Sequence, residues 1–392
     1  MRAASDEIRA CARSTLPFRV SEEMVAAFAE LTGDRSPLHV SEGFARLSVY
    51  RRPVVHGMLP LGFIALLDCF HIEGFRCVPV GMTGHFNAPV YPGDRLTLVA
   101  ERRETREPEA AVTFDYHIEN QSTGNTVTRG TVTVKYDNQP APARPVTSES
   151  GAPILLSSAE MQNFRLEDIK KGQKDGFDFR ITDQTLEEFI NLIAPGAACA
   201  QELDRTALRN RFYLPNLLSI LLFSTSVGIC LPGASATFLE FAAEADGEVG
   251  LDLIHRLDGE VTHLSRSTRL IKKELTISRL DEEAVLFRGT AAALVNEPSR
   301  RMPAIRDLKA SALDFGVKGK VVLITGASRG IGETTAKLFG LMGAKVVVNY
   351  HRGAEDAARV VTEIVAEGGD AIVARADVTR REEVSSLIGL AA

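Results

Sequence analysis

The sequence predicts two α+β units, each an apolar helix wrapped by a bent antiparallel sheet, followed by the first half of an α/β parallel sheet. Three observations support this fold class. At 392 residues the chain is too long for a single hydrophobic core. Two long segments repeat the same order of helix and alternating strands. The last segment instead alternates apolar strands with helices, which is typical of parallel sheets.

The two repeated units open in the same way. Phe18-Arg19-Val20-Ser21 precedes a predicted helix over 22–29, and Phe179-Arg180-Ile181-Thr182 precedes one over 186–192, with Ser or Thr as the N-cap. In both units an apolar helix follows, and strands with period-two patterning come last. We expect the apolar helices at 57–67 and 217–227, and strands at 94–101, 130–136, 266–277 and 284–295. Two such units would sit side by side.

The third unit reads strand, helix, strand, helix, strand over 320–325, 331–341, 345–350, 354–367 and 370–375. Only the first of the two mononucleotide halves of a Rossmann-type fold is expected here, which predicts a truncated unit. A proline-rich connector and an irregular arginine-rich stretch separate the units. The predicted domains are 1–138, 154–297 and 318–392, with linkers at 139–153 and 298–317.

Bulk composition excludes several classes of protein. The net charge of −6 argues against a nucleic-acid partner, which would need a clustered basic face. Five scattered cysteines without a CxxC pair fit free thiols in the cytoplasm. The uncharged stretch 212–239 is interrupted by prolines and hydroxyl residues, so it predicts a buried core helix and no membrane span.

One short loop near the N-terminus carries a carboxylate and an imidazole. It reads Gly33-Asp34-Arg35-Ser36-Pro37-Leu38-His39, and Pro53-Val54-Val55-His56-Gly57-Met58 follows it. Asp34 and a neutral His39 could hold one water between them and move its protons. The alternative is an exposed loop with an N-cap Asp and an unrelated His. His56 is predicted to be structural. The remaining histidines of this unit have no partners at ligand spacing, so no metal site is expected; they are His71, His85 and His117.

These motifs, the small Ala45, and Phe86-Asn87-Ala88-Pro89-Val90-Tyr91-Pro92-Gly93-Asp94 resemble the MaoC-like, R-specific enoyl-thioester hydratases, whose units adopt the hot-dog fold. The resemblance implies that the unit adds water to 2-enoyl thioesters, or removes it from (R)-3-hydroxyacyl thioesters, on CoA or an acyl carrier protein. It assigns catalysis to Asp34 and His39, and stabilisation of the enolate oxygen to the Gly57 N–H. Ser36 departs from the usual Asn, and Gly62 and Ala65 stand where some members carry an active-site Ser.

The second unit lacks the Asp-x-x-Pro-x-His motif. By resemblance it is a degenerate hot-dog half that completes the groove, which makes the first two units a double hot-dog. An unrelated α+β domain is the alternative. A homodimer of the whole chain is also expected.

The third unit contains Thr325-Gly326-Ala327-Ser328-Arg329-Gly330-Ile331-Gly332 between a strand and a helix. Its glycines allow a tight turn and close approach of a pyrophosphate. This segment resembles short-chain dehydrogenases/reductases of the ketoacyl reductase type. That family contacts adenine at the position of Asp377 and Val378. Its catalytic Ser, Tyr and Lys would lie beyond Ala392.

The end of the second strand suggests which dinucleotide binds. An acidic residue there would favour NAD, whereas this chain has Asn349-Tyr350-His351-Arg352, with Arg329 in the turn. We therefore expect NADP(H), and no cofactor for the hydratase unit. The cofactor-binding residues would be Gly326, Ser328, Arg329, Gly330, Ile331, Gly332, Arg352, Asp377 and Val378.

Together these features predict a hydratase/dehydratase joined to an NADPH-dependent 3-ketoacyl reductase. Reduction would make the hydroxyacyl group that Asp34 and His39 dehydrate. One alternative is a non-catalytic acyl-thioester-binding module that serves the reductase. Thioesterase activity is a third hypothesis.

Overall fold

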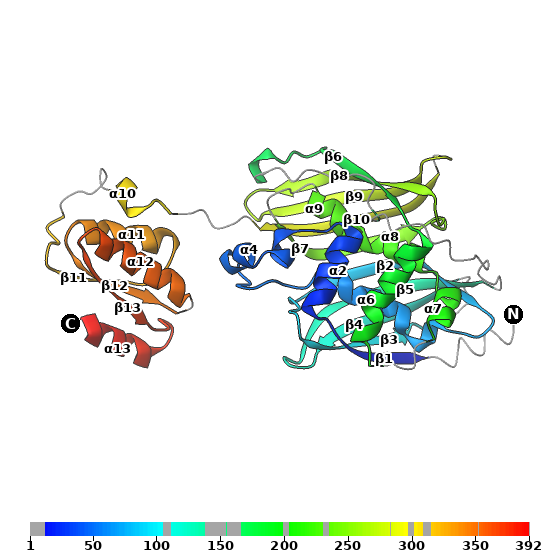
Figure 1. Cartoon of the computed structure of the whole chain (residues 1–392), viewed down its shortest axis with the longest axis horizontal. Coiled ribbons are helices and arrows are strands. Elements are labelled where there is room, and N and C mark those ends of the chain that lie inside the picture. Colours follow the sequence, from blue (N-terminus) through cyan, green and yellow to red (C-terminus); the bar gives the residue numbers. More distant parts are fainter. Residues whose placement is uncertain are drawn as a thin grey trace. The chain divides into compact units, whose positions relative to one another are not determined.

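The protein is described by a computed structural model, in which the chain divides into two compact units, 1–298 and 299–392 (Figure 1). The structure describes residues 12–104, 111–137, 154, 166–198, 204–229, 235–282, 284–296, 302–308, 315–351 and 353–391. The predicted linker 139–153 and the predicted cofactor contact Arg352 lie outside these residues.

The first unit is built on one antiparallel sheet of ten strands, in the order β1-β3-β4-β5-β2-β7-β10-β9-β8-β6. The first half of the unit contributes five strands: β1 (Arg13–Arg19), β2 (Arg76–Phe86), β3 (Arg95–Arg102), β4 (Val112–Asn120) and β5 (Asn125–Asp137). The second half contributes the other five: β6 (Lys174–Arg180), β7 (Ser235–Ala245), β8 (Ile254–Ser265), β9 (Leu270–Arg279) and β10 (Val285–Asn296).

The strand order is mirrored about the pair β2–β7. Reading outward from that pair, the first half runs β2, β5, β4, β3, β1, and the second runs β7, β10, β9, β8, β6. The two central strands pair from Gly81↔Glu244 to His85↔Glu240. The two α+β units predicted from the repeat therefore lie side by side in one continuous sheet. The strand expected over 266–277 begins only at Leu270, because residues 266–269 form a turn in which Arg269 has a φ of 57°.

Helices cover one face of this sheet (Figure 1). The first half supplies α2 (Glu22–Thr32), α3 (Pro37–Val40), α4 (Glu42–Leu47), α5 (Leu59–Gly62) and the 3₁₀ turns η1 (Phe63–Leu66) and η2 (Asp68–Phe70). The second half supplies η3 (Leu166–Asp168), α6 (Asp183–Ile193), η4 (Ala194–Gly196), α7 (Arg205–Arg211), α8 (Leu214–Leu221) and α9 (Phe223–Ile229). Ser21 and Thr182 cap α2 and α6 as predicted.

The central helices of the two halves differ in length. The helix expected over 57–67 begins only at Leu59 and continues as the 3₁₀ turn η1. In the second half, α8 and α9 continue the central helix through Ile229, and every residue of α8 is buried. None of the helices among the described residues has the length and apolar character needed to cross a membrane.

The second unit has a parallel sheet in the order β11-β12-β13, formed by β11 (Val321–Ile324), β12 (Lys345–Tyr350) and β13 (Asp370–Arg375). Its helices are α10 (Ile305–Leu308), α11 (Gly330–Leu341), α12 (Ala354–Ala366) and α13 (Arg381–Ala391). The predicted strand–helix alternation is present, whereas α13 was not foreseen. Part of the expected linker 298–317 belongs to this unit, because Ile305 of α10 is buried in its core.

Candidate active site and dinucleotide-binding turn

The candidate catalytic loop follows directly from the end of α2. Gly33 ends that helix with a φ of 71°, a left-handed conformation that favours glycine. The side chain of Asp34 then accepts a hydrogen bond from the Ser36 N–H (3.3 Å), and Pro37 begins the single turn α3, which carries His39. A tight turn followed by one helical turn thus returns His39 towards Asp34.

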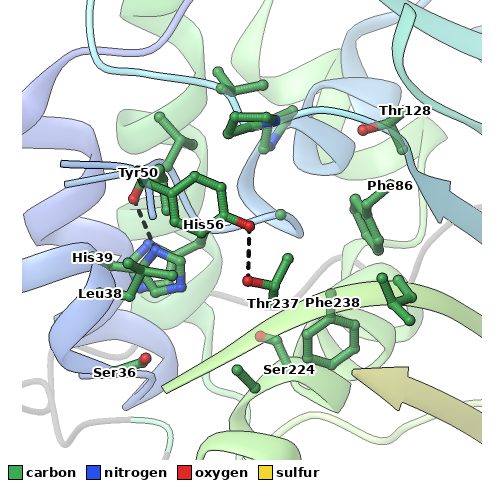
Figure 2. Close-up of a pocket in the computed structure, with 18 of the residues that line it drawn as sticks. Ser36, Leu38, His39, Tyr50, His56, Phe86, Thr128, Ser224, Thr237 and Phe238 are labelled. Carbon is green, nitrogen blue, oxygen red and sulfur yellow. Dashed lines mark hydrogen bonds between the residues drawn. The ribbon is translucent and has the colours of Figure 1, made fainter. Parts of the chain in front are cut away.

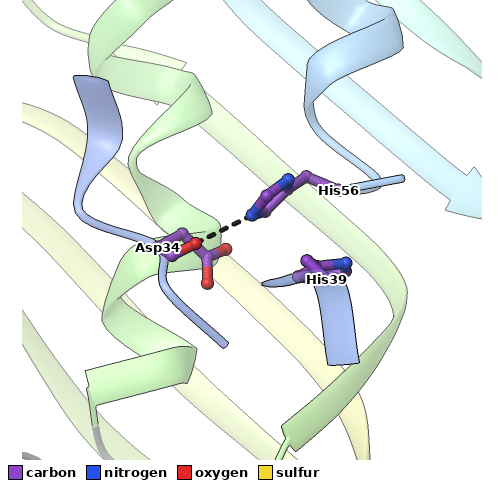
Figure 3. A group of neighbouring side chains, drawn as sticks. All are labelled: Asp34, His39 and His56. Atoms are coloured by element: carbon purple, nitrogen blue, oxygen red, sulfur yellow. Dashed lines mark hydrogen bonds between the residues drawn. The ribbon is translucent and has the colours of Figure 1, made fainter. Parts of the chain in front are cut away.

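The structure brings Asp34, His39 and His56 together (Figure 3). One potential ligand atom of each residue lies within 4.8 Å of the others. Asp34 is 6% exposed and His56 is fully buried, whereas His39 is half-buried. All three residues also line one cavity, so the structure places the pair predicted from the loop sequence at the surface of that cavity.

His39 is held in one orientation by its Nδ1 atom, which lies 2.8 Å from the carbonyl oxygen of Val54. A carbonyl only accepts hydrogen bonds, so Nδ1 carries the proton and the lone pair is on Nε2. Burial lowers the pKa of His39, although the charge of Asp34 acts in the opposite direction. At neutral pH the ring is therefore neutral, with Nε2 free to accept a proton.

His56 has a supporting geometry. Its Nε2 donates to the backbone carbonyl of Asp34 at 2.8 Å, and its ring lies 4.0 Å from that of His39, centroid to centroid. Burial lowers its pKa to about 3, so it stays neutral throughout the physiological range. These contacts fit the predicted structural role, because His56 holds the backbone of Asp34.

Gly57 lines the same cavity, immediately before α5. Within the described residues, no oxygen accepts a hydrogen bond from its N–H. A Cβ at this position would lie 3.1 Å from Cε1 of Phe86. The dipole of the central helix is the other predicted source of stabilisation at Gly57. Since α5 has only four residues, that contribution is small, and the free N–H itself is the relevant donor.

The cavity has a volume of 260 Å³ and is lined by both halves of the unit. Figure 2 shows His39 and His56 on one side and Phe86 and Phe238 on the other. Between them, the hydroxyl of Tyr50 forms a 2.9 Å hydrogen bond with that of Thr237. The lining residues that sequence analysis missed include Tyr50 and Thr128 from the first half, and Ser224, Gly228, Thr237 and Phe238 from the second.

Ala65, where some relatives carry a serine, is fully buried and does not line the cavity. The second half supplies pocket hydroxyls from Ser224 on α9 and Thr237 on β7. No pattern in the sequence could have placed them there, because their approach depends on the pairing of β2 with β7.

In the second half, the residues before α8 are packed against the core. Phe212 and Tyr213 immediately precede α8, whereas His56 and Gly57 stand three and two residues before α5. Phe212 is fully buried against Phe70, with ring centroids 5.8 Å apart. Buried Asn216 then donates to the carbonyl of Pro79 (2.9 Å). Hydrophobic and hydrogen-bonding side chains thus surround the start of α8.

Asp34, His39 and His56 are also the group of three potential metal ligands found among the described residues. One nitrogen of His39 donates to the carbonyl of Val54, and one nitrogen of His56 donates to that of Asp34. Each imidazole therefore has one nitrogen left that could bind a metal ion. The expectation that the site works without a metal stays a prediction.

In the second unit, the glycine-rich turn lies at the carboxyl end of β11 and leads into α11. Gly326 and Gly330 have φ values of 62° and 59°. A Cβ at Gly332 would lie only 2.5 Å from the carbonyl oxygen of Gly326. Ile331 is 87% exposed at the start of the helix, whereas Ser328 is buried. This turn fits a pyrophosphate, since it exposes backbone at a helix N-terminus without side chains in the way.

The other predicted cofactor residues lie at the same edge of the sheet. Arg329 forms a 3.4 Å ion pair with Asp356 in the first turn of α12, and Asp377 and Val378 follow β13. Hydrogen bonds from Thr379, together with His351 and Arg380, lower the pKa of Asp377. Asn349 turns inward and joins the Gly326 N–H (3.3 Å) to the carbonyl of Ala374 (3.2 Å), so its side chain supports the turn.

Comparisons with known proteins identify similar domains for both units. A model of the MaoC like domain matches residues 6–122, and a model of the short chain dehydrogenases matches residues 320–392. The first half is 35% identical over 128 residues to the (R)-specific enoyl-CoA hydratase of Aeromonas caviae. That alignment covers 33% of this chain and 94% of the hydratase.

A solved structure from Mycobacterium tuberculosis, described as a double hot-dog fold, has a TM-score of 0.50 at 12% identity and covers 71% of this chain and 93% of its own. This likeness concerns the fold alone, and it confirms the predicted double hot-dog.

The last segment is 51% identical over 69 residues to the 3-oxoacyl-[acyl-carrier-protein] reductase of Synechocystis sp., covering 18% of this chain and 28% of the reductase. The chain thus spans little more than a quarter of that relative. By its first unit the chain belongs to the MaoC-like hydratase family, and its second unit is a short-chain dehydrogenase segment.

Proposed function

We propose that the first unit catalyses the (R)-specific hydration of 2-enoyl thioesters and the reverse dehydration of 3-hydroxyacyl thioesters. The observation that carries this proposal is the placement of Asp34, the lone pair of His39 and the free Gly57 N–H on one cavity. The Aeromonas caviae relative is named as an (R)-specific enoyl-CoA hydratase, which supports the same reaction. The thioester would be carried by CoA or by an acyl carrier protein.

The chemistry follows from the three groups. A water held between the Asp34 carboxylate and Nε2 of His39 gives up a proton, and its oxygen bonds to C3 of the enoyl group. The electron pair of the double bond moves towards the thioester carbonyl, where the Gly57 N–H stabilises the developing negative charge. A proton returned to C2 from the same acid–base pair completes the reaction, so that H and OH have been added across the double bond.

Hydration of crotonyl thioesters by the Asp34→Asn and His39→Gln variants tests this assignment. We expect each to lower kcat by about 10²–10⁴-fold, the usual contribution of a general acid or base. Wild-type-like rates in either variant would remove the assigned pair. A chelator such as EDTA should leave the wild-type rate unchanged if the site needs no metal.

The same assays separate the rival functions. Acyl-thioester binding without turnover at any chain length would favour a non-catalytic binding module. Release of free thiol would instead reveal a thioesterase.

We propose in addition that the turn after β11 binds NADP(H), which supplies the hydride for reducing a 3-ketoacyl thioester when it is bound. Gly326, Gly330 and Gly332 would admit the pyrophosphate, while Arg329 and Arg352 would contact the 2′-phosphate. Asp377 and Val378 would lie beside the adenine. The reduced thioester would then be the substrate for dehydration at Asp34 and His39.

Titration of the full chain with NADPH and NADH tests this choice of cofactor. The Arg329→Gln variant should weaken NADPH binding by about 10- to 150-fold, since a charge-assisted hydrogen bond is worth roughly 1.5–3 kcal/mol, and should leave NADH binding unchanged. Equal losses for both dinucleotides would contradict the 2′-phosphate assignment. A homodimer of the whole chain and a cytoplasmic location stay predictions.

A further inference from the structure

The longer central helix belongs to the half without the acid–base motif, and its last turns contact the catalytic loop of the other half. The hydroxyl of Thr225 on α9 donates to the carbonyl oxygen of Thr32 at 3.0 Å. Both residues are almost completely buried, at 1% and 0% exposure. This hydrogen bond joins residues 193 positions apart in the chain.

Thr32 is two residues before Asp34 and its side chain is hydrogen-bonded to the Asp34 backbone. The Thr32 hydroxyl accepts a hydrogen bond from the Asp34 N–H (3.3 Å) and donates to the carbonyl of Phe28 (2.7 Å). The backbone of Asp34 is therefore held by Thr32 at its N–H and by His56 at its carbonyl. Thr225 holds the carbonyl of Thr32, so α9 is linked to the backbone of Asp34 through two hydrogen bonds.

One turn further along α9, Gly228 faces the carboxylate itself. A Cβ built on Gly228 would lie 3.3 Å from Oδ1 of Asp34, which is tighter than most contacts of a real Cβ. Gly228 also lines the catalytic cavity. The absence of a side chain at this position allows the helix to approach the carboxylate.

The opposite side of α9 is anchored by a buried ion pair. Nζ of the fully buried Lys273 donates to the carbonyl (2.9 Å) and the hydroxyl (3.0 Å) of Ser226, and pairs with Asp175. A cation near the C-terminal end of a helix satisfies its free carbonyls and interacts favourably with the helix dipole. The anchor fixes α9 to strands β6 and β9 of its own half.

We infer that α9 is a positioning element for the acid–base pair, with the Thr225 hydroxyl and the missing side chain of Gly228 setting the place of the Asp34 carboxylate. The inference rests on the proposed hydratase function. It assigns the second half a part in catalysis beyond completing the groove.

The test compares Thr225→Val, which keeps the shape and removes the donor, with Thr225→Ser, which keeps the donor. In crotonyl-thioester hydration we expect the Val variant to lose about tenfold in kcat with KM within about twofold, because misplacement by a fraction of an ångström lowers the rate. The Ser variant should return to within about twofold of the wild type. Ser219→Ala, which removes a buried hydroxyl from α8 that bonds only to the carbonyl of Pro215, is the matched control.

A second readout separates positioning from stability. The ionisable groups that face His39 are the Asp34 carboxylate and the neutral His56 ring, and the charge of Asp34 raises the pKa of His39. If the carboxylate moves away in Thr225→Val, the acid limb of kcat/KM shifts to lower pH. A loss of stability alone would not move it.

Gly228→Ala provides an independent variant if Thr225→Val does not fold. It should lower kcat and move the acid limb in the same direction. Wild-type kcat and an unshifted limb in the folded variants would overturn this inference while leaving the hydratase assignment intact. A wild-type protein that does not hydrate any enoyl thioester would instead overturn the proposed function.

Discussion

The two halves of the first unit share one sheet topology and differ at the start of the central helix. In the first half, His56 and Gly57 border a cavity of 260 Å³. In the second half, Phe212 and Tyr213 immediately precede α8, with Phe212 fully buried and the Tyr213 hydroxyl hydrogen-bonded to the carbonyl of Val249 at 2.7 Å. The two central helices therefore begin differently: ionisable groups line a cavity beside the first, and a buried aromatic ring packs beside the second.

Under the proposed function, the two halves of the first unit divide stability and chemistry between them. Burying an imidazole and a carboxylate together costs stability, and a cavity forfeits packing contacts. The second half has neither cost at the start of α8. It also has the longer central helix, whose last turns contact the catalytic loop. Under the proposed function, the half without the acid–base motif thus supports the half that carries it.

The largest expected effect comes from removing the buried ring of Phe212, before α8. Phe212→Ala should destabilise the first unit by about 3–5 kcal/mol, because it removes a fully buried ring and leaves a cavity. Urea unfolding measures this change. Phe238→Ala, which enlarges an existing cavity, is the control and should cost clearly less. Equal losses for the two variants would contradict the distinction between the packed start of α8 and the cavity.

A smaller effect concerns pH and only the first half. His39 must be neutral to accept a proton, and burial lowers its pKa below the ordinary 6.5. In the hydration direction, kcat/KM should therefore decline as the ring becomes protonated, with a midpoint below pH 6.5. A pH profile of crotonyl-thioester hydration measures this limb. A midpoint at or above pH 6.5 would show that His39 is not the limiting base or that its pKa is not lowered.

The candidate catalytic residues could be found from the sequence because their spacing is local. Asp34 and His39 stand five positions apart, and a glycine in a left-handed conformation and a proline at the start of a helical turn bring them together. The glycine-rich turn was recognisable for the same reason. Ser224, Gly228 and Thr237 could not be found, because they reach the cavity through the pairing of β2 with β7. Nothing in their own neighbourhood marks them.

The sequence by itself determined the repeated helix-and-strand pattern, the parallel order of the last unit, and the residue types of the acid–base loop and the dinucleotide turn. Local hydrogen bonding, glycine and proline conformations and the periodicity of apolar residues act over a few positions, so they are visible in the chain. Only the tertiary structure decided that the two halves join in one sheet, that the first central helix stops at Leu66, and that α9 reaches Asp34. These features depend on contacts such as Thr225 with Thr32, between residues 193 positions apart, and long-range packing leaves no local signal.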